Sequence, residues 1–214
     1  VNGKAYDNLR VLCKTVGGRV AGSPQMLKAE AWGVKALQQA GADKVWLQEC
    51  KVPHWIRGSK EEAVFTISGK KTILDVLALG NSIGTGAKGV SAPVLLINSF
   101  EELERRKEEI KGKIVFYNYK FNPKFIKTFQ SDGDASRYRG QGPSRAAKYG
   151  AVAVMIRSMS HATDNNPHTG ATNYDTSYAK IPAVAIGLKD ADKLAAAIET
   201  NKPVTVFIKS NAKM

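Results

Sequence analysis

Residues 80–84 read Gly-Asn-Ser-Ile-Gly and match the G-x-S-x-G pattern in which a hydrolase presents a nucleophilic serine. The pattern requires a strand before Ser82 and a helix after it, because that sharp turn exposes the hydroxyl. Residues 74–79 are apolar enough for a strand, but residues 85–89, Thr-Gly-Ala-Lys-Gly, are poor helix formers. We therefore expect a glycine-rich β-turn here, and a serine hydrolase that uses Ser82 remains an alternative.

The same turn contains a second motif, because residues 84–89 fit G-x-G-x-x-G. In a dinucleotide-binding protein this motif leads into a helix whose N-terminus faces the pyrophosphate. Here residues 90–97 have the β-branched and apolar character of a strand instead. The sequence therefore does not predict a nucleotide site.

Polar residues that could bind a metal gather in one loop, which holds His161, Asp164 and His168. A catalytic zinc site takes about three protein ligands from a rigid framework. These residues are surrounded by Asn and Thr and show neither an H-x-x-x-H nor an H-x-D pattern. The acidic residues at 132–134 and 101–109 indicate a turn and a charged helix face, not two converging carboxylates. We predict no catalytic residue and no metal ligand in this chain.

Two apolar segments flank this loop and would position it. Residues 151–157 follow a helix that we expect to begin near Pro143 and to end at Gly150, and residues 181–187 follow an Ile-Pro step. Short, almost continuous apolar runs of this kind are typical of strands that are buried on both faces. The sequence therefore predicts a rigid pair of strands that presents the polar loop 158–180.

The rest of the chain gives clear signals for further elements. The expected helices are one within residues 6–16, one that begins at Ser23-Pro24 and ends at Gly41, one that begins at the capping box Ser99–Glu102 and ends near Gly112, and one that begins at Asp190. The expected strands are residues 45–52, 63–67, 74–79, 93–97, 114–119 and 204–208.

This order suggests a chain that leaves one domain and returns to it. The first helices, residues 45–52 and the last strand would be parts of a host domain, and the β-rich middle would be inserted into it. The host piece alone is too small to make a proper core.

Composition sets broader limits. Hydrophobic residues make up 43% of the 214 residues, so a core is feasible, and no apolar run approaches the roughly 20 residues of a membrane span. Cys13 and Cys50 form no C-x-x-C pair, which favours buried thiols over a zinc or redox motif, although pairing in an oxidising compartment stays open.

The formal net charge is +13. A solvated basic surface explains this charge most simply, and a basic binding module for nucleic acid or other polyanions is the alternative. Residues 120–148 carry the densest basic stretch, interleaved with aromatic residues: Phe121, Phe125, Phe129 and Tyr138.

Several stretches together resemble known proteins. Residues 112–117, 147–151 and 181–183 resemble a protease-associated domain. Over essentially all 214 residues, and in the same order, the chain resembles the front part of the carboxypeptidase Q (plasma glutamate carboxypeptidase) group of zinc-dependent, aminopeptidase-like enzymes. The matching stretches are Arg19 with Gly22-Ser23, then residues 53–58, 80–85, 99–103, 156–158 and 167–170.

The resemblance implies an α+β fold in which a protease-associated β/β/α domain is inserted into a truncated α/β zinc-peptidase domain. Residues 1–56 would be the helices and edge strand of the peptidase domain, residues 57–202 the inserted domain, and residues 203–214 the returning strand of the peptidase domain. It also implies that the full-length enzyme binds two zinc ions through an H-x-D strand end and further residues beyond Met214. We therefore expect this chain to be a non-catalytic, inactive part of a secreted or periplasmic exopeptidase, without a cofactor of its own.

The resemblance further implies that the inserted domain lies beside a catalytic cleft, shapes the access of peptide or dipeptide substrates, and takes part in a homodimer. The loop 158–180 would be the edge of that cleft. Arg157 would pair with a substrate carboxylate, or else form an ion pair or a bond that fixes the loop. His168 and Thr169 would hydrogen-bond peptide groups. Residues 120–139 depart from the family pattern.

Overall fold

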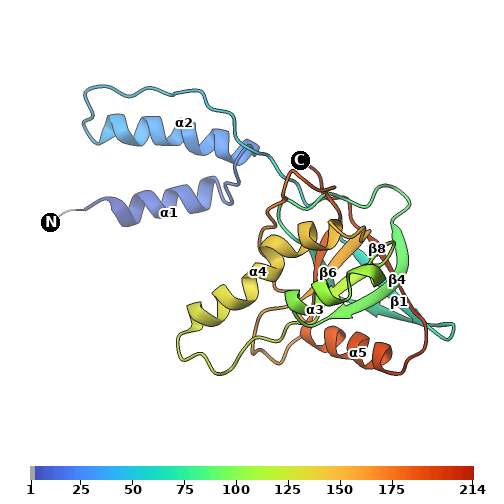
Figure 1. The fold of residues 1–214 in the computed structure, drawn as a ribbon. Helices are drawn as coiled ribbons and strands as arrows, with labels where there is room; N and C mark the ends of the chain where they lie inside the picture. Colours follow the sequence, from blue (N-terminus) through green and yellow to red (C-terminus); the bar gives the residue numbers. More distant parts are fainter. Residues whose placement is uncertain (1–2) are drawn as a thin grey trace. The chain divides into compact units, whose positions relative to one another are not determined.

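The computed structural model describes residues 3–214, and the chain divides into two compact units, residues 1–54 and 55–214. The first unit contains α1 (Ala5–Thr15) and α2 (Pro24–Gln39) (Figure 1). The α2 helix begins as predicted, because the Ser23 side chain accepts a hydrogen bond from the Met26 amide at 3.2 Å. It also ends as predicted, since Gly41 has a φ of +89° and follows the last turn.

The strand expected at residues 45–52 is wrong. This segment has no regular secondary structure, and none of the described residues of the first unit forms a strand. A strand needs a neighbour for its backbone N–H and C=O groups, and residues 3–54 offer it none. The β-type sequence pattern was therefore not enough to make a strand here.

The first unit has no core of its own. None of its described residues is buried, and the expectation that Cys13 and Cys50 are buried thiols is wrong, because both are exposed. Large apolar side chains are exposed along both helices and the segment after them: Tyr6, Leu9, Val11, Val20, Leu27, Leu37, Trp46, Leu47 and Val52. This agrees with the expectation that the piece is too small to bury a core alone.

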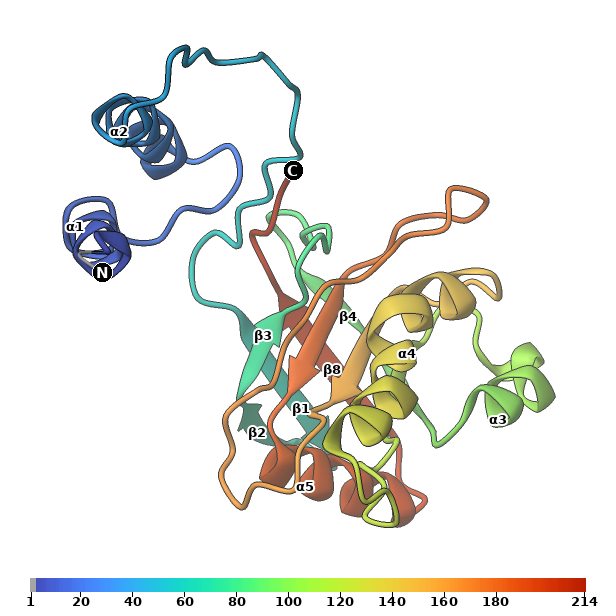
Figure 2. The same ribbon diagram turned by 90° about the vertical axis from the view of Figure 1, so that its left-hand side faces the viewer.

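The second unit is built on an eight-stranded sheet with the order β2-β1-β8-β4-β5-β6-β7-β3 (Figure 2). Its strands are β1 (Glu62–Ile67), β2 (Lys70–Leu74), β3 (Val76–Ala78), β4 (Val90–Ile97), β5 (Ile114–Tyr117), β6 (Ala153–Arg157), β7 (Ala183–Ile186) and β8 (Val204–Lys209). Strands β4 to β7 run parallel to one another, and the other pairs are antiparallel. Only Asp75 separates β2 from β3, so the two edges of the sheet meet and the sheet curls toward a barrel.

Helices cover both faces of the sheet. One core lies under α3 (Phe100–Arg105) and α4 (Thr128–Ala147), and the other lies under α5 (Leu188–Glu199). Alternate side chains of β5 enter the two cores, with Ile114 and Phe116 on the α5 face and Val115 and Tyr117 on the α4 face. The buried strands predicted at 151–157 and 181–187 are thus confirmed as β6 and β7, and the fold is a mixed α/β fold.

The α4 helix is longer than predicted. The expected start at Pro143 is wrong, because the helix begins at Thr128 and Pro143 lies inside it. The residues before Pro143 are rich in Gly, Ser and Asp, which have low helix propensity, yet Ala135 and Tyr138 are buried in the core. Gly142 lets the helix approach β5: a Cβ there would lie 2.9 Å from the Tyr117 ring.

Two other expectations need correction. The capping box at Ser99 does start α3, since the Ser99 side chain accepts from the Glu102 amide at 3.1 Å, but α3 ends at Arg105 instead of near Gly112. A short 3₁₀ helix, Lys107–Glu109, follows it. The last strand, β8, does not belong to a separate domain as the boundary at residue 203 implied. It pairs with β1 and β4 inside the sheet, because its alternate apolar residues are buried there.

Candidate functional site

The segment between the carboxyl end of β6 and the start of β7 contains residues 158–180, the loop that the sequence predicts as the candidate site. Its first residues are held by hydrogen bonds. The Ser158 hydroxyl donates to the Ile186 carbonyl at 2.7 Å and accepts from the His168 amide at 2.7 Å. The loop therefore folds back on itself directly above the strand ends, and this positions His168 and Thr169.

Arg157 ends β6 and is only 8% exposed. Its Nη1 atom donates to Asn118 Oδ1 at 3.1 Å and to Asp192 Oδ1 at 2.7 Å. The guanidinium thus joins the ends of β5 and β6 to α5. The sequence left two roles open for Arg157. The structure shows the ion pair, and the contact with a substrate carboxylate stays a prediction.

His168 has its ring fixed from one side. Its Nδ1 atom lies 3.0 Å from the Met159 carbonyl oxygen, and no residue from 3 to 214 bonds to Nε2. The side chain is exposed. The neighbouring Thr169 carbonyl accepts a hydrogen bond from Arg139 Nη1 of α4 at 2.9 Å. Both residues thus lie on the outer side of a loop whose backbone is restrained, which is suitable geometry for contacting a ligand.

A cluster at the start of α5 fixes the other side of the loop, and sequence reasoning missed it. Asn165 Nδ2 donates to Asp75 Oδ2 and Asp190 Oδ2, each at 2.8 Å. Asp190 also accepts from the Asp75 amide at 2.7 Å and from Lys193 Nζ at 2.9 Å. Burial raises the pKa of Asp190, but these hydrogen bonds and the Lys193 charge outweigh it, so the pKa of this carboxyl lies below its ordinary value.

The metal-type residues of the loop do not converge. Among residues 3–214, no group of three or more His, Cys, Asp or Glu side chains could hold a metal ion. His161 instead packs edge-on against Phe121, with ring centroids 4.8 Å apart.

Ser82 is not an exposed nucleophile. It is 1% exposed, and its hydroxyl accepts from the Ala183 amide and donates to the Ile83 carbonyl, each at 2.9 Å. Residues 85–89 lead into β4 and not into a helix, which agrees with the predicted turn and excludes both the nucleophile motif and the dinucleotide motif. The serine hydrolase alternative is therefore wrong.

The aromatic residues of the stretch 120–148 do not form a continuous stacking surface. Tyr138 is buried in the core, and Phe121 is half-buried against His161. Phe125 and Phe129 are exposed. A groove that binds single strands needs a row of exposed aromatic rings, so the structure gives the nucleic-acid alternative little support.

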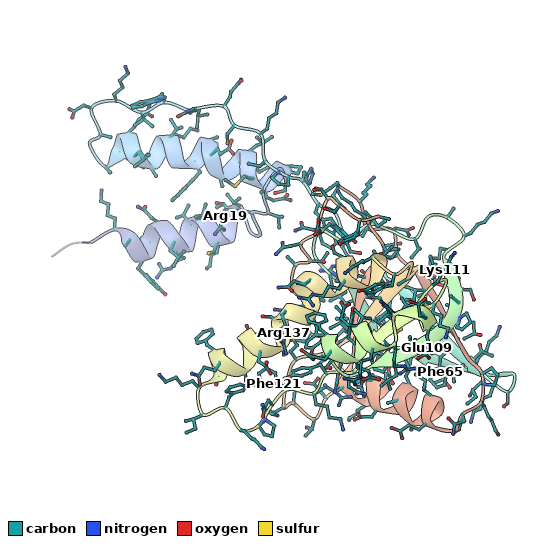
Figure 3. All side chains as sticks on the ribbon, viewed as in Figure 1. Arg19, Phe65, Glu109, Lys111, Phe121 and Arg137 are labelled. Carbon is teal, nitrogen blue, oxygen red and sulfur yellow. The ribbon has the colours of Figure 1, made fainter. Side chains whose placement is uncertain are left out.

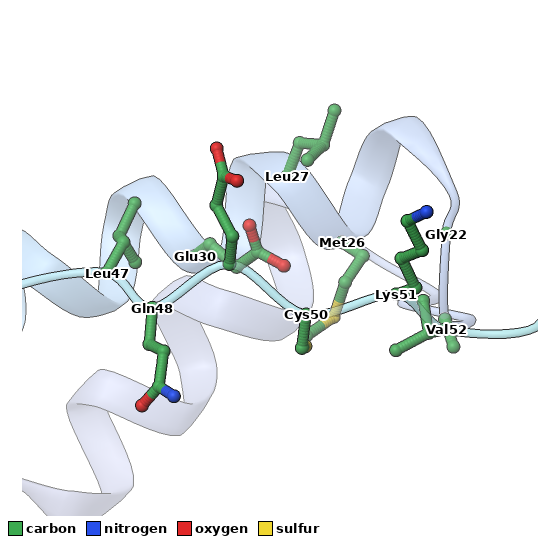
Figure 4. Close-up of a pocket in the computed structure, with 11 residues that line it drawn as sticks. Gly22, Met26, Leu27, Glu30, Leu47, Gln48, Cys50, Lys51 and Val52 are labelled. Carbon is green, nitrogen blue, oxygen red and sulfur yellow. The ribbon is translucent and has the colours of Figure 1, made fainter.

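The first unit has a cavity of about 770 Å³ between α2 and residues 47–52 (Figure 4). Met26 and Leu27 of α2 line it, together with Cys50 and Val52. Its walls are mostly apolar, and the charged residues that line it are Glu30, Glu49 and Lys51. The cavity is an extension of the exposed apolar surface of this unit and contains none of the predicted site residues.

Relatives of known identity match this chain from end to end. Carboxypeptidase Q from Xenopus laevis is 40% identical over 99% of the chain, and the human enzyme is 37% identical over 98%. The chain spans less than half the length of these relatives, 44% and 42% respectively. No family model matches the sequence. The predicted resemblance to the carboxypeptidase Q group is confirmed.

Solved structures agree with this result. A peptidase M28 precursor from Shewanella amazonensis has a TM-score of 0.82 and 32% identity, over 97% of this chain and 46% of that one. A zinc aminopeptidase from Bacillus subtilis shares the fold, with a TM-score of 0.53 and 19% identity over 97% of this chain and 42% of that one.

Proposed function

Because this chain is homologous to a part of carboxypeptidase Q along nearly all of its length, we propose that it is the non-catalytic part of a zinc-dependent exopeptidase. The end-to-end match to 42–44% of those enzymes carries this proposal. Residues 57–202, extended through β8, would form the protease-associated domain. The pairing of Ile56 with Lys213 supports an insertion, since it brings the entry and exit of this segment side by side.

The loop 158–180 would form one edge of a substrate cleft. His168 offers a free Nε2 atom on a restrained ring, and the Thr169 side chain lies beside it on the same loop. These groups suit hydrogen bonds to the amide or carboxylate of a short peptide. Arg157 would act indirectly by fixing the strand ends through Asp192 and Asn118.

Two zinc ions would be bound by residues other than those described here, since these bring no three ligands together. The residues of this chain would take no direct part in the chemistry. We further propose a secreted or periplasmic enzyme that acts as a homodimer on peptides or dipeptides. No helix among the described residues is long and apolar enough to cross a membrane.

A peptidase assay tests the non-catalytic role. The 214-residue chain, incubated with zinc and dipeptides, should hydrolyse no more substrate than buffer with zinc. Turnover well above that background that is lost on substitution of a residue in this chain would contradict the proposal.

A second assay tests the cleft edge, in a protein that joins this chain to the remaining part of a carboxypeptidase Q relative. His168→Ala should raise KM for dipeptides about tenfold with little change in kcat, as the loss of one hydrogen bond predicts. His161→Ala, which removes an exposed histidine of the same loop that packs on Phe121, is the matched control. Equal effects of the two substitutions would show that His168 has no special role.

A further inference from the structure

We propose that residues 120–131, which we call the apolar-basic tip, insert into the surface of a membrane that contains anionic lipid. The tip comprises the loop before α4 and the first turn of that helix. Figure 1 shows the N-terminal half of α4 extending beyond the sheet. The inference does not depend on the proposed peptidase role.

Three large apolar side chains of the tip face solvent. Ile126 is 100% exposed, Phe129 is 90% exposed and Phe125 is 38% exposed. The next turns of the same helix bury Ala135 and Tyr138 in the core. The tip therefore adds nothing to the core of the second unit, and three large neighbouring apolar groups in water point to a binding surface.

The charge of the tip identifies the partner. Lys120, Lys124 and Lys127 are exposed between these apolar residues. No Asp or Glu occurs between residues 119 and 131. Anionic headgroups attract lysines near the membrane surface, and aromatic and aliphatic side chains insert at the boundary between headgroups and acyl chains. Both components are present within 12 consecutive residues.

The tip is also held in a defined conformation. The Ser131 hydroxyl donates to the Asn122 carbonyl at 3.0 Å, and the Lys124 amide donates to Asn122 Oδ1 at 3.0 Å. Phe121, visible in Figure 3, packs against His161 at the base of the tip. Because these bonds already restrain the backbone of the tip, insertion costs little backbone conformational entropy.

Two other occupants fit less well. If the tips of two copies met, their lysines would repel one another on a chain that already carries a net charge of +13. A nucleic acid could stack its bases on the rings of Phe125 and Phe129. It would leave Ile126 without an apolar environment, because this side chain has no ring on which a base could stack.

Vesicle co-sedimentation of the 214-residue chain tests the inference. We expect binding to phosphatidylcholine vesicles with about one third phosphatidylserine, weakened by salt, and much weaker binding to pure phosphatidylcholine. The pair Ile126→Asp and Phe129→Asp should lower the partition coefficient at least about tenfold. Ile73→Asp is the matched control, since Ile73 is 79% exposed on β2, outside the tip.

Substitution of lysines separates the electrostatic contribution to vesicle binding from the apolar contribution. Lys124→Gln with Lys127→Gln should lower the partition coefficient several-fold at low salt, whereas Lys70→Gln with Lys71→Gln on β2 should leave it nearly unchanged. Circular dichroism checks that each variant keeps its fold. The inference fails if the chain does not bind phosphatidylserine vesicles at low salt, or if the controls weaken binding as much as the tip variants. It also fails if the tip variants leave vesicle binding unchanged and abolish dimer formation or oligonucleotide binding.

Discussion

Ser82 shows how a residue that matches a catalytic motif can have a structural role instead. Its hydroxyl bridges the turn after β3 and the first residue of β7, because it accepts from the Ala183 amide and donates to the Ile83 carbonyl. The Ser82 carbonyl also accepts from Trp55 Nε1 at 2.9 Å. All of these groups lie in the second unit, so the serine contributes to its stability and not to chemistry.

Replacing Ser82 should therefore destabilise the protein. Ser82→Ala leaves the buried Ala183 N–H without its acceptor, which costs about 1–3 kcal/mol. Urea unfolding measures this change. Ser91→Ala, at an exposed position on β4, is the control and should stay within about 0.5 kcal/mol. Equal midpoints for Ser82→Ala and the unmodified chain would rule out the structural role.

Asp190 provides a pH-dependent prediction. Its folded pKa is depressed, so its contribution is present above the unfolded value of about 3.9 and is lost as the pH falls through the folded pKa. Asp190→Asn should lower the unfolding free energy by about 1–3 kcal/mol at pH 7, and the difference should shrink below about pH 4. Urea unfolding at pH 7 and pH 3 checks this. The exposed Glu199→Gln should show neither effect, and a loss that does not vary with pH would contradict the assignment.

At the scale of elements, the β6–β7 loop is fixed by its contacts with α5 as well as by the strands. Gly187 lies where the loop passes over the start of α5, and a Cβ there would lie 2.1 Å from the Asn165 carbonyl oxygen. The φ of Gly187 is −60°, which other residues can also adopt. Glycine is therefore required by the close contact with Asn165 and not by the backbone conformation. The cluster of Asn165, Asp75 and Asp190 follows from this close approach.

Gly187→Ala should therefore displace the loop and destabilise the chain by about 1–3 kcal/mol. Thermal unfolding and hydrogen exchange at residues 158–170 measure the two effects. Gly133→Ala is the matched control, since Gly133 lies in α4 with no heavy atom within 4 Å of the added methyl group. It should stabilise α4 by about 0.5–1 kcal/mol. If both substitutions act alike, the contact with Asn165 is unimportant.

At the scale of the whole molecule, the two units differ in how much they bury. The second unit contains both hydrophobic cores, whereas no described residue of the first unit is buried. Because burial of apolar surface provides most of the folding free energy, nearly all of the stability should come from residues 55–214.

Residues 55–214 alone should therefore unfold cooperatively. Their thermal midpoint should lie within a few degrees of that of the whole chain, which is the shift expected for a change of about 1 kcal/mol in the free energy of unfolding. Residues 3–54 alone should show no cooperative transition. Differential scanning calorimetry of the two pieces and the whole chain provides the test. A large loss of stability in the shortened chain would show that the first unit contributes more than its burial indicates.

Local patterns determined much of this protein. The apolar runs at 151–157 and 181–187, the cap at Ser23 and the glycine-rich turn at 80–89 each form as predicted, because each depends on residues close in sequence. The resemblance to carboxypeptidase Q depended on motifs that follow one another in a fixed order.

Tertiary contacts decided the rest. Residues 45–52 have strand character but no neighbour to pair with, and residues 128–142 have poor helix propensity but bury Ala135 and Tyr138. The position of the last strand in the sequence suggests a return to another domain, but β8 pairs with β1 and β4 of the same sheet. The sequence left open whether Arg157 contacts a ligand or forms an ion pair, and only the tertiary structure places Asp192 of α5 within 2.7 Å of its guanidinium. Pairing partners and ion pairs join residues far apart in the chain, so local sequence does not specify them.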